Sequence, residues 1–410
     1  MRSVSIFAVA LAAGAAAMIA MPADAQKRGK KAAYAGPSLS KEERTALAAL
    51  ETALAARDYA GANAALTSAR SAARGSDARY YLSGLQLRLG RETNNQALQS
   101  AAIDALIASG RVTGAELGQL YAAQGALASF AGERRRADGA FMRAMELAPT
   151  PDTALALAQL KIDNRKDAEA VPLIERAIAL RAATGQPVPE SWYRRGITVA
   201  TIAKLAPQAL KLSREWVAAY PSPQNWRDAV LLYRDYAKPD QAGLLDATRL
   251  MRLTKGLAGE RDYFEAAAAF SSANLPGESR SVFEEGVSGR MVDPAKATFK
   301  EAIAASAKNA TAARAKLAAL RTAAGAAATG APALDAGDQH LSFGDYAAAA
   351  DLYRAAATKG GVDPAVASTR LGISLALAGR RAEAEAAFRA VAGPRAELAS
   401  LWLVWLGQRA

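Results

Sequence analysis

Cysteine is absent from this 410-residue sequence, and histidine occurs only once, at His340. The chain therefore has no thiol nucleophile, no disulfide and no metal site built from several cysteine or histidine ligands. Glycine-rich phosphate-binding loops of the P-loop or Rossmann kind are missing too. Carboxylate pairs such as Glu284 and Glu285 remain, but adjacent helix positions point to different sides, so we interpret them as solvated surface. The sequence predicts no catalytic residue, no cofactor and no metal.

Aromatic residues are also scarce, at 6% of the chain, whereas alanine is abundant. Because Ala has the highest helix propensity and no side-chain entropy to lose, this bias favours closely packed helices over sheets. The single histidine falls within a helical repeat described below, and we interpret His340 as a packing residue rather than a functional one.

Long apolar runs are missing except at the N-terminus, where residues 4–21 form one. This run follows Arg2 and precedes the tripeptide ADA at 23–25, a small-x-small cleavage site, so residues 1–25 are typical of a secretory signal peptide. An uncleaved anchor is the alternative, because the run approaches spanning length. We expect cleavage after Ala25 and a periplasmic protein without a lipid anchor. The formal charge of +12 allows an anionic partner, and nucleic acid is not expected outside the cytoplasm.

A repeating pattern opens with Tyr121 and Gly125, which lie four residues apart and so share one face of a helix. Gly132 follows where this helix should end, in the left-handed turn that glycine tolerates best. We expect the missing side chain of Gly125 to let a second helix approach closely. The first half of the pattern is therefore a helix followed by a tight turn.

The second half of the pattern contains Ala137, Phe141 and Ala144, the apolar stripe of another amphipathic helix, which Pro149 ends. Two helices joined by a tight turn make an antiparallel hairpin. The Phe141 ring should fill the hole beside the crossing point of the two helices. One hairpin cannot bury both sides of its apolar stripe, so stability requires stacked copies.

Copies of the pattern recur near the C-terminus, at Gly337, Ala349, Tyr353, Gly372, Ala384 and Phe388. These residues resemble the tetratricopeptide repeat (TPR), a helical hairpin of about 34 residues. The resemblance is specific at 118–151 and 330–398, fair at 151–225 and degenerate elsewhere. It implies an all-α solenoid of stacked antiparallel hairpins, wound into a right-handed superhelix whose concave groove holds partner segments.

The organisation along the chain follows from composition. Residues 26–40 form a basic leader that we expect to be flexible, and a capping-box pattern opens the helix after it. Residues 41–321 are predicted to be a TPR-like array. The stretch 322–333 is small, uncharged and contains Gly and Pro, so it is interpreted as a hinge. Residues 334–410 complete the chain as two repeats and a capping helix, and continuity of the superhelix across the hinge stays open.

Three sets of side chains are candidates for partner binding. One pair lies on the predicted groove, one arginine run begins a helix where the macrodipole disfavours cations, and one tryptophan pair lies in the last helix. The sets are Tyr81 and Leu85; Arg134, Arg135 and Arg136; and Trp402 and Trp405. For the arginines we favour a solvated surface that keeps an alanine-rich helix soluble, with partner binding as the alternative. The tryptophans either plug the last hairpin or dock a partner.

These features predict a non-catalytic scaffold or adaptor of the bacterial cell envelope that binds other envelope proteins in a TPR groove. The step from repeats to binding is an analogy at the level of the fold. Two alternatives stay open: a helical subunit of a peptidoglycan-acting enzyme system, and a basic binder of anionic glycans or lipids. Binding that weakens steeply with salt would favour the last of these.

Overall fold

The computed structural model describes residues 38–409 of the chain. Within that range it contains 21 α-helices and no strand, which confirms the predicted all-α class. The proposed signal peptide, residues 1–25, and most of the basic leader lie outside the described residues. No helix in the described part is both long enough and apolar enough to cross a membrane.

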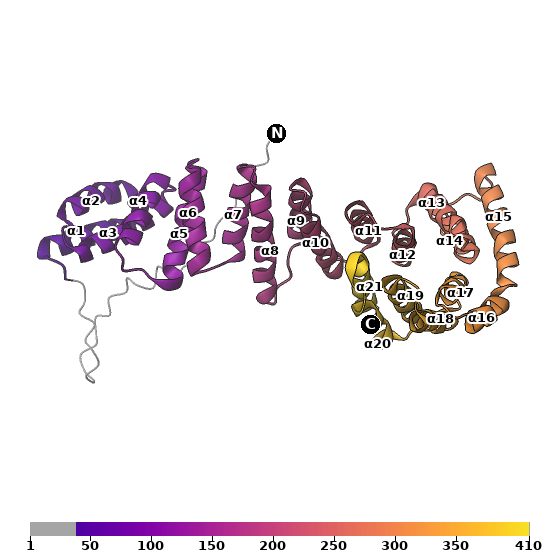
Figure 1. Ribbon diagram of the computed structural model, residues 1–410. Coiled ribbons are helices and arrows are strands. Elements are labelled where there is room, and N and C mark those ends of the chain that lie inside the picture. The colour runs from indigo at the N-terminus through magenta and orange to yellow at the C-terminus, as the bar shows by residue number, and fades with distance from the viewer. Residues whose placement is uncertain (1–37, 410) are drawn as a thin grey trace. The chain divides into compact units, whose positions relative to one another are not determined.

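The chain divides into two compact units, one ending at Val188 and the other beginning at Pro189. The described part of unit 1 contains eight helices, which pair in chain order as antiparallel hairpins (Figure 1). Their bounds are α1 Lys41–Ala55, α2 Tyr59–Ala72, α3 Ser76–Glu92, α4 Gln96–Ala108, α5 Gly114–Phe130, α6 Arg134–Leu147, α7 Pro151–Asp163 and α8 Asp167–Ala183.

Unit 2 contains the remaining helices and one short 3₁₀ turn, η2. Their bounds are α9 Glu190–Ile202, α10 Ala206–Ala219, α11 Pro223–Ala237, α12 Gln241–Leu253, α13 Gly259–Ser272, α14 Pro276–Ser288, α15 Ala297–Arg314, α16 Leu317–Ala326, α17 Ala331–Ser342, α18 Tyr346–Lys359, α19 Pro364–Leu377, α20 Arg381–Arg389, η2 Gly393–Arg395 and α21 Ala396–Gly407.

One turn geometry joins the two helices of most hairpins. The residue two positions before the second helix adopts a left-handed conformation, as at Gly132, Gly344 and Gly379, with φ near +77°. The same place is taken by Arg57, Asn94, Arg165, Lys204 and Asn274, with φ between +51° and +59°. A left-handed conformation costs a non-glycine residue about 1–2 kcal/mol, so hairpin packing must outweigh a penalty in the five turns that lack glycine.

Close helix approach inside the best-matched hairpins depends on glycine packed against an aromatic ring. A Cβ atom placed on Gly125 would lie 2.6 Å from Cδ1 of Phe141, sixteen positions further along. The same spacing joins Gly337 to Tyr353 and Gly372 to Phe388, with distances of 2.8 and 2.6 Å. Any larger residue at these glycines would push the ring or the helix aside, because real Cβ atoms do not approach other atoms so closely.

The predicted hinge at 322–333 requires correction. Most of it is helical, since α16 continues to Ala326 and α17 begins at Ala331. The boundary between compact units falls instead at residues 188 and 189, inside the predicted array of residues 41–321. The hinge was predicted because residues 322–333 are small and uncharged. Many of them are alanines, however, and alanine also forms helices well.

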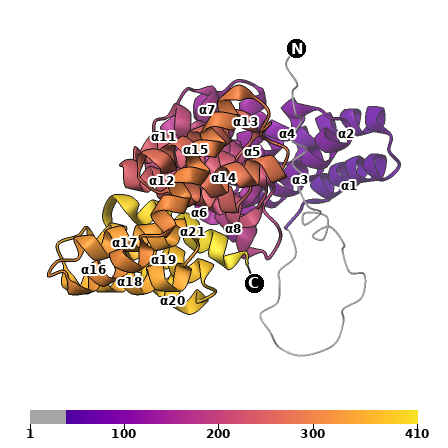
Figure 2. The same ribbon diagram turned by 90° about the vertical axis from the view of Figure 1, so that its right-hand side faces the viewer.

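Unit 2 is closed rather than an open run of hairpins. Its C-terminal helices return to earlier ones: α21 packs against α10 and α12, α19 against α12, and α17 against α14. In both views α17–α20 lie below α11–α14 (Figures 1 and 2). The long helix α15 and the shorter α16 carry the chain from one layer to the other.

Candidate binding cavity

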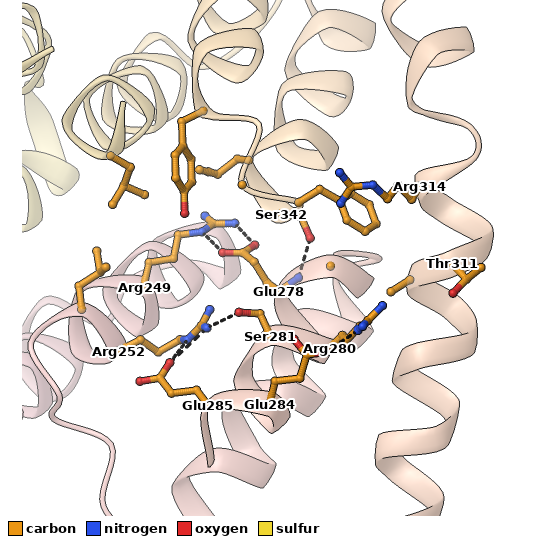
Figure 3. Close-up of a pocket in the computed structure, with 18 of the residues that line it drawn as sticks. Arg249, Arg252, Glu278, Arg280, Ser281, Glu284, Glu285, Thr311, Arg314 and Ser342 are labelled. Carbon is orange, nitrogen blue, oxygen red and sulfur yellow. Dashed lines mark hydrogen bonds and ion pairs between the residues drawn. The ribbon is translucent and has the colours of Figure 1, made fainter. Parts of the chain in front are cut away.

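A cavity of about 960 Å³ lies inside unit 2, among α12, α14, α15 and α17 (Figure 3). Tyr346, Leu377 and Arg409 add side chains from the C-terminal layer. This volume is at the upper end of the range typical for ligand pockets, about 300–1,000 Å³. We name it the basic cavity, because basic side chains outnumber acidic ones among its lining residues.

Six basic and three acidic side chains line the basic cavity, which gives the lining a formal charge of +3. The basic residues are Arg249, Arg252, Lys255, Arg280, Arg314 and Arg409, and the acidic ones are Glu278, Glu284 and Glu285. The remainder of the wall includes apolar side chains such as Leu253, Leu341 and Phe343. The cavity is therefore both cationic and apolar.

Two of the arginines are paired with carboxylates of their own. Arg249 donates from Nε and Nη2 to the two carboxylate oxygens of Glu278, each at 2.7 Å. Arg280 donates to Glu284 one helical turn away, at 2.7 Å (Figure 3). Burial alone would lower the pKa of Arg249, but Glu278 and the buried Asp246 raise it well above the ordinary value. Arg249 thus stays charged and is a fixed part of the wall.

Arg252 and Lys255 compete for one carboxylate. Arg252 donates to Glu285 at 3.3 Å and to the hydroxyl of Ser281 at 2.9 Å, while Lys255 donates to the other oxygen of Glu285 at 3.1 Å. Good charge-assisted hydrogen bonds of this type measure about 2.7–2.9 Å. Two cations that share one carboxylate through long bonds leave one positive charge without compensation.

Arg314 and Arg409 have no carboxylate partner within the described part of the chain, and each lies over an aromatic ring instead. The guanidinium of Arg314 is 5.6 Å from the centre of the Phe343 ring, and that of Arg409 is 4.8 Å from the Trp405 ring. At an exposed site such a contact is worth about 0.5–1 kcal/mol. These contacts orient the two arginines and leave their N–H groups available.

A buried charge cluster holds the C-terminal layer against α12. Asp246 is fully buried and accepts hydrogen bonds from Arg249 at 2.5 Å and from Arg395 at 3.0 Å, with Arg370 Nε at 3.7 Å. Arg370 also donates to Asp338 at 2.5 Å. We name Asp246 and these three arginines the Asp246 clasp. It joins residues up to 149 positions apart, and one of its members, Arg249, lines the basic cavity.

The last helix is fixed independently of the clasp. Gln408 accepts a hydrogen bond from Trp226 Nε1 at 3.2 Å and donates to the carbonyl oxygen of Val217 at 2.7 Å. Glu397, at the start of α21, accepts from Arg214 at 2.5 Å. Arg409 follows Gln408 directly, so these contacts determine where the Arg409 side chain meets the cavity.

The predicted groove pair and tryptophan pair need correction. Leu85 is 4% exposed and belongs to the core of unit 1, and Tyr81 packs against that core. Trp402 is fully buried and stacks on Phe388 with ring centres 5.9 Å apart. Trp405 is 5% exposed and contacts Trp402 edge to face. Hairpin packing and the closure of unit 2 cover Leu85, Trp402 and Trp405, which leaves them no surface for docking. Tyr81 is only half-buried, and its binding role stays a prediction.

The predicted arginine run is divided in the structure. Arg134 and Arg135 are exposed at the start of α6. Arg136 binds both oxygens of Asp104, at 2.5 and 2.6 Å, and donates to Glu133 at 2.9 Å, so it links neighbouring hairpins. The basic cavity lies in unit 2, and none of the three arginines contributes to it.

His340 is buried, as its place in a repeat predicted, and its Nδ1 lies 3.4 Å from Asp345. None of the residues that line the basic cavity was among the predicted partner-binding residues. The sequence indicated an anionic partner only through its overall positive charge. A signal was present, since Arg249 and Arg252 lie three positions apart on one side of α12 and Lys255 follows in the turn after it. It was weak, because basic residues spaced in this way are common on solvated helices.

Comparison with known proteins gives matches of fold only. No family model and no curated protein matches the sequence. A tetratricopeptide repeat protein from Parabacteroides merdae is 11% identical, over 65% of this chain and 99% of that one, with a TM-score of 0.33. The Naa15/Naa10 complex bound to HypK-THB is 11% identical over 75% and 62%, with a TM-score of 0.30. The APC/C hetero-tetramer Cut9–Hcn1 is 14% identical over 90% and 80%, with a TM-score of 0.24.

The hairpins of this chain are TPR-like on their own geometry. Paired helices, a left-handed turn and the glycine–aromatic contact at Gly125, Gly337 and Gly372 recur along it. The low identities and TM-scores of the solved structures carry no inference about partner or activity. Function must be argued from the site itself.

Proposed function

We propose that this protein is a non-catalytic interaction scaffold that holds a short segment of a partner protein in the basic cavity of unit 2. The observation that carries this proposal is the composition of the cavity wall. Charged groups such as Arg314 and Arg252 stand beside apolar ones such as Phe343 and Leu341. Such a surface suits a peptide, because a peptide offers apolar side chains and hydrogen-bonding groups at once.

The size of the cavity agrees with a short segment rather than a folded partner. About 960 Å³ is comparable to the space that drug-sized ligands fill. The Asp246 clasp holds α12, and the contacts of Gln408 hold the residue that precedes Arg409, so two parts of the wall are fixed. A preformed wall of this kind reduces the ordering cost that binding must overcome.

We further propose that the scaffold acts in the bacterial cell envelope. Residues 1–25 have the arrangement of a signal peptide, and the chain has no cysteine that would depend on a redox environment. Fractionation of cells that express the full chain tests this placement. Recovery of the shortened protein, beginning at Gln26, with the periplasmic fraction is expected. Recovery of the uncut chain in the cytosol would refute it.

Site-specific photo-crosslinking in cells tests partner binding. A photoreactive residue is introduced at Thr311, which lines the cavity, and for comparison at Asp235, which is exposed on α11 of the same unit. We expect discrete protein adducts from position 311 and none of the same mass from position 235. Identical adducts from both positions, or none from either, would contradict a partner site in the cavity.

The non-catalytic part of the proposal is tested separately. The purified protein is incubated with peptidoglycan, and soluble muropeptides are measured. No release above a buffer control is expected. Release that disappears when Glu284 or Glu285 is replaced would show an enzyme instead.

A further inference from the structure

We infer that the segment held in the basic cavity is acidic, and that Arg314 and Arg409 are the residues that pair with its carboxylates. This inference rests on the proposed function, since it names the chemistry of the partner at the same site. Both arginines line the cavity and have no carboxylate partner among the described residues.

The charge balance of the wall supports an anionic occupant. The formal charge of the lining is +3, because six basic side chains face three acidic ones. Arg249 and Arg280 are matched by Glu278 and Glu284. The excess therefore lies with Arg314, with Arg409 and with the pair that shares Glu285. A segment with two or three carboxylates would neutralise it.

Arg314 is positioned to receive such a carboxylate. It ends α15, and the Phe343 ring from the turn after α17 lies against its guanidinium. Figure 3 shows Arg314 on the opposite side of the cavity from Arg252, with Thr311 further along the same helix. A ring contact leaves the edge of a guanidinium free, so all of its N–H donors stay available for a bidentate carboxylate.

Arg409 stands at another place on the wall and is held there. Gln408, the residue before it, is anchored by Trp226 and by the Val217 carbonyl, and the Trp405 ring supports the guanidinium. Arg409 therefore belongs to a wall whose backbone is ordered by α10 and α11. Cations on separate elements are better matched by carboxylates spaced along a chain than by one compact anion.

The apolar part of the wall argues against a small inorganic anion. Phe343, Leu341 and Leu377 line the same cavity as the arginines. Phosphate would leave these side chains without a partner, whereas a segment that alternates acidic with aliphatic residues would bury part of them. Burial of apolar area contributes about 25 cal/mol per Å². The expected occupant is thus a short acidic segment that also contains aliphatic side chains.

The test uses a defined probe and the full chain. The probe is a fluorescein-labelled ten-residue peptide in which Glu alternates with Leu, and a matched peptide carries Gln in place of every Glu. Binding to wild type, to Arg314→Gln, to Arg409→Gln and to the double variant is measured by fluorescence anisotropy. The control is Arg261→Gln, since the Arg261 side chain is 87% exposed and lies outside the cavity. Circular dichroism checks that each variant is folded.

We expect the acidic peptide to bind wild type and the control alike, within about twofold. Each single variant should lose about threefold in affinity and the double variant about tenfold or more, because each removes one partly exposed ion pair. The affinity of wild type should also fall as salt rises, and this dependence should weaken in the double variant. The Gln peptide should bind much more weakly than the Glu peptide to wild type.

Three outcomes would overturn the inference. Equal affinity for the two peptides, or an unchanged affinity of the double variant, would show that carboxylates are not what these arginines recognise. Displacement of the peptide by inorganic phosphate at equal concentration would show a small-anion site. If any of these outcomes occurs while photo-crosslinked adducts still form at position 311, the scaffold proposal stands and only the acidic-segment inference fails. If no adduct forms there, the scaffold proposal fails as well.

Discussion

Replacing Asp246 by Asn should weaken unit 2 strongly while leaving the shape of the side chain unchanged. Asp246 is fully buried and compensates Arg249, Arg395 and Arg370 at 2.5, 3.0 and 3.7 Å. Removing one partner of a buried ion pair costs about 3–5 kcal/mol, because the remaining charge stays buried without compensation. All three arginines keep another carboxylate, so we expect the lower end, about 3 kcal/mol.

The measurement can be confined to unit 2. All five tryptophans lie after residue 189, so tryptophan fluorescence during urea unfolding follows this unit alone. A loss of about 3 kcal/mol with a slope of about 3 kcal/mol per M lowers the midpoint by about 1 M urea. Asp235→Asn is the matched control. Asp235 is exposed on α11, and such surface changes stay within about 0.5 kcal/mol.

A double-mutant cycle decides whether the loss comes from the clasp. Arg395→Gln alone should also destabilise unit 2, since Arg395 is 6% exposed and binds Asp246. Together with Asp246→Asn the two losses should be less than additive, with a coupling of about 0.5–3 kcal/mol. Additive losses, or a midpoint for Asp246→Asn equal to that of Asp235→Asn, would refute the view that the clasp closes unit 2.

Three further predictions concern packing, pH and the last helix. Gly125→Leu should cost about 1–3 kcal/mol by forcing the Phe141 ring aside. Gly139→Leu, where a Cβ meets nothing within 4 Å, should not lower the thermal unfolding midpoint, since Leu favours a helix more than Gly does; equal downward shifts would contradict the packing role. Backbone hydrogen bonds lower the pKa of Glu43 below 4.5, so its stabilisation is present above pH 4.5 and is lost as pH falls through the lowered value. Glu43→Gln should flatten that part of an acid unfolding curve for unit 1 followed by circular dichroism, and an unchanged curve would refute the role. Deleting 398–410 should lower the stability of unit 2 sharply in urea, because it removes buried tryptophans; a normal midpoint would contradict this.

The hairpin itself could be predicted from sequence because its causes are local. The glycine–aromatic contact joins residues sixteen positions apart, and the turn needs only one left-handed residue. The degenerate repeats were harder to detect, because the local glycine signal is missing from their turns. Arg57, Arg165 and Lys204 take the place of the turn glycine, so the signal disappears although the backbone is preserved.

The division into units was not predictable in this way. Composition marked 322–333 as a joint, but Ala-rich residues there extend α16 and begin α17. The true boundary, at 188 and 189, depends on which hairpins share a core. That is a property of tertiary packing, and local composition carries no information about it.

Trp402 and Leu85 show that an apolar residue in a repeat can be either a docking surface or part of the core, and that the sequence pattern alone does not distinguish the two. A solenoid that stays open would leave the last helix with an uncovered apolar side, which is why docking was a reasonable alternative for Trp402. Closure of unit 2 removes that alternative, since α21 packs against α10 and α12. Leu85 is buried by its own neighbours in unit 1. Burial in both cases results from helices that the sequence pattern could not place relative to each other.

The basic cavity depends on the same closure, and this links the stability of unit 2 to its proposed binding function. Arg249 belongs to both, since it binds Asp246 in the clasp and Glu278 on the cavity wall. Arg409 reaches the wall only because α21 is held against earlier helices. Weakening the clasp should therefore reduce binding of an acidic segment even though Asp246 does not line the cavity. An Asp246→Asn variant that is folded but binds the acidic peptide as wild type does would show that binding does not depend on the clasp. The cavity would then have to be formed by α12, α14 and α15 alone.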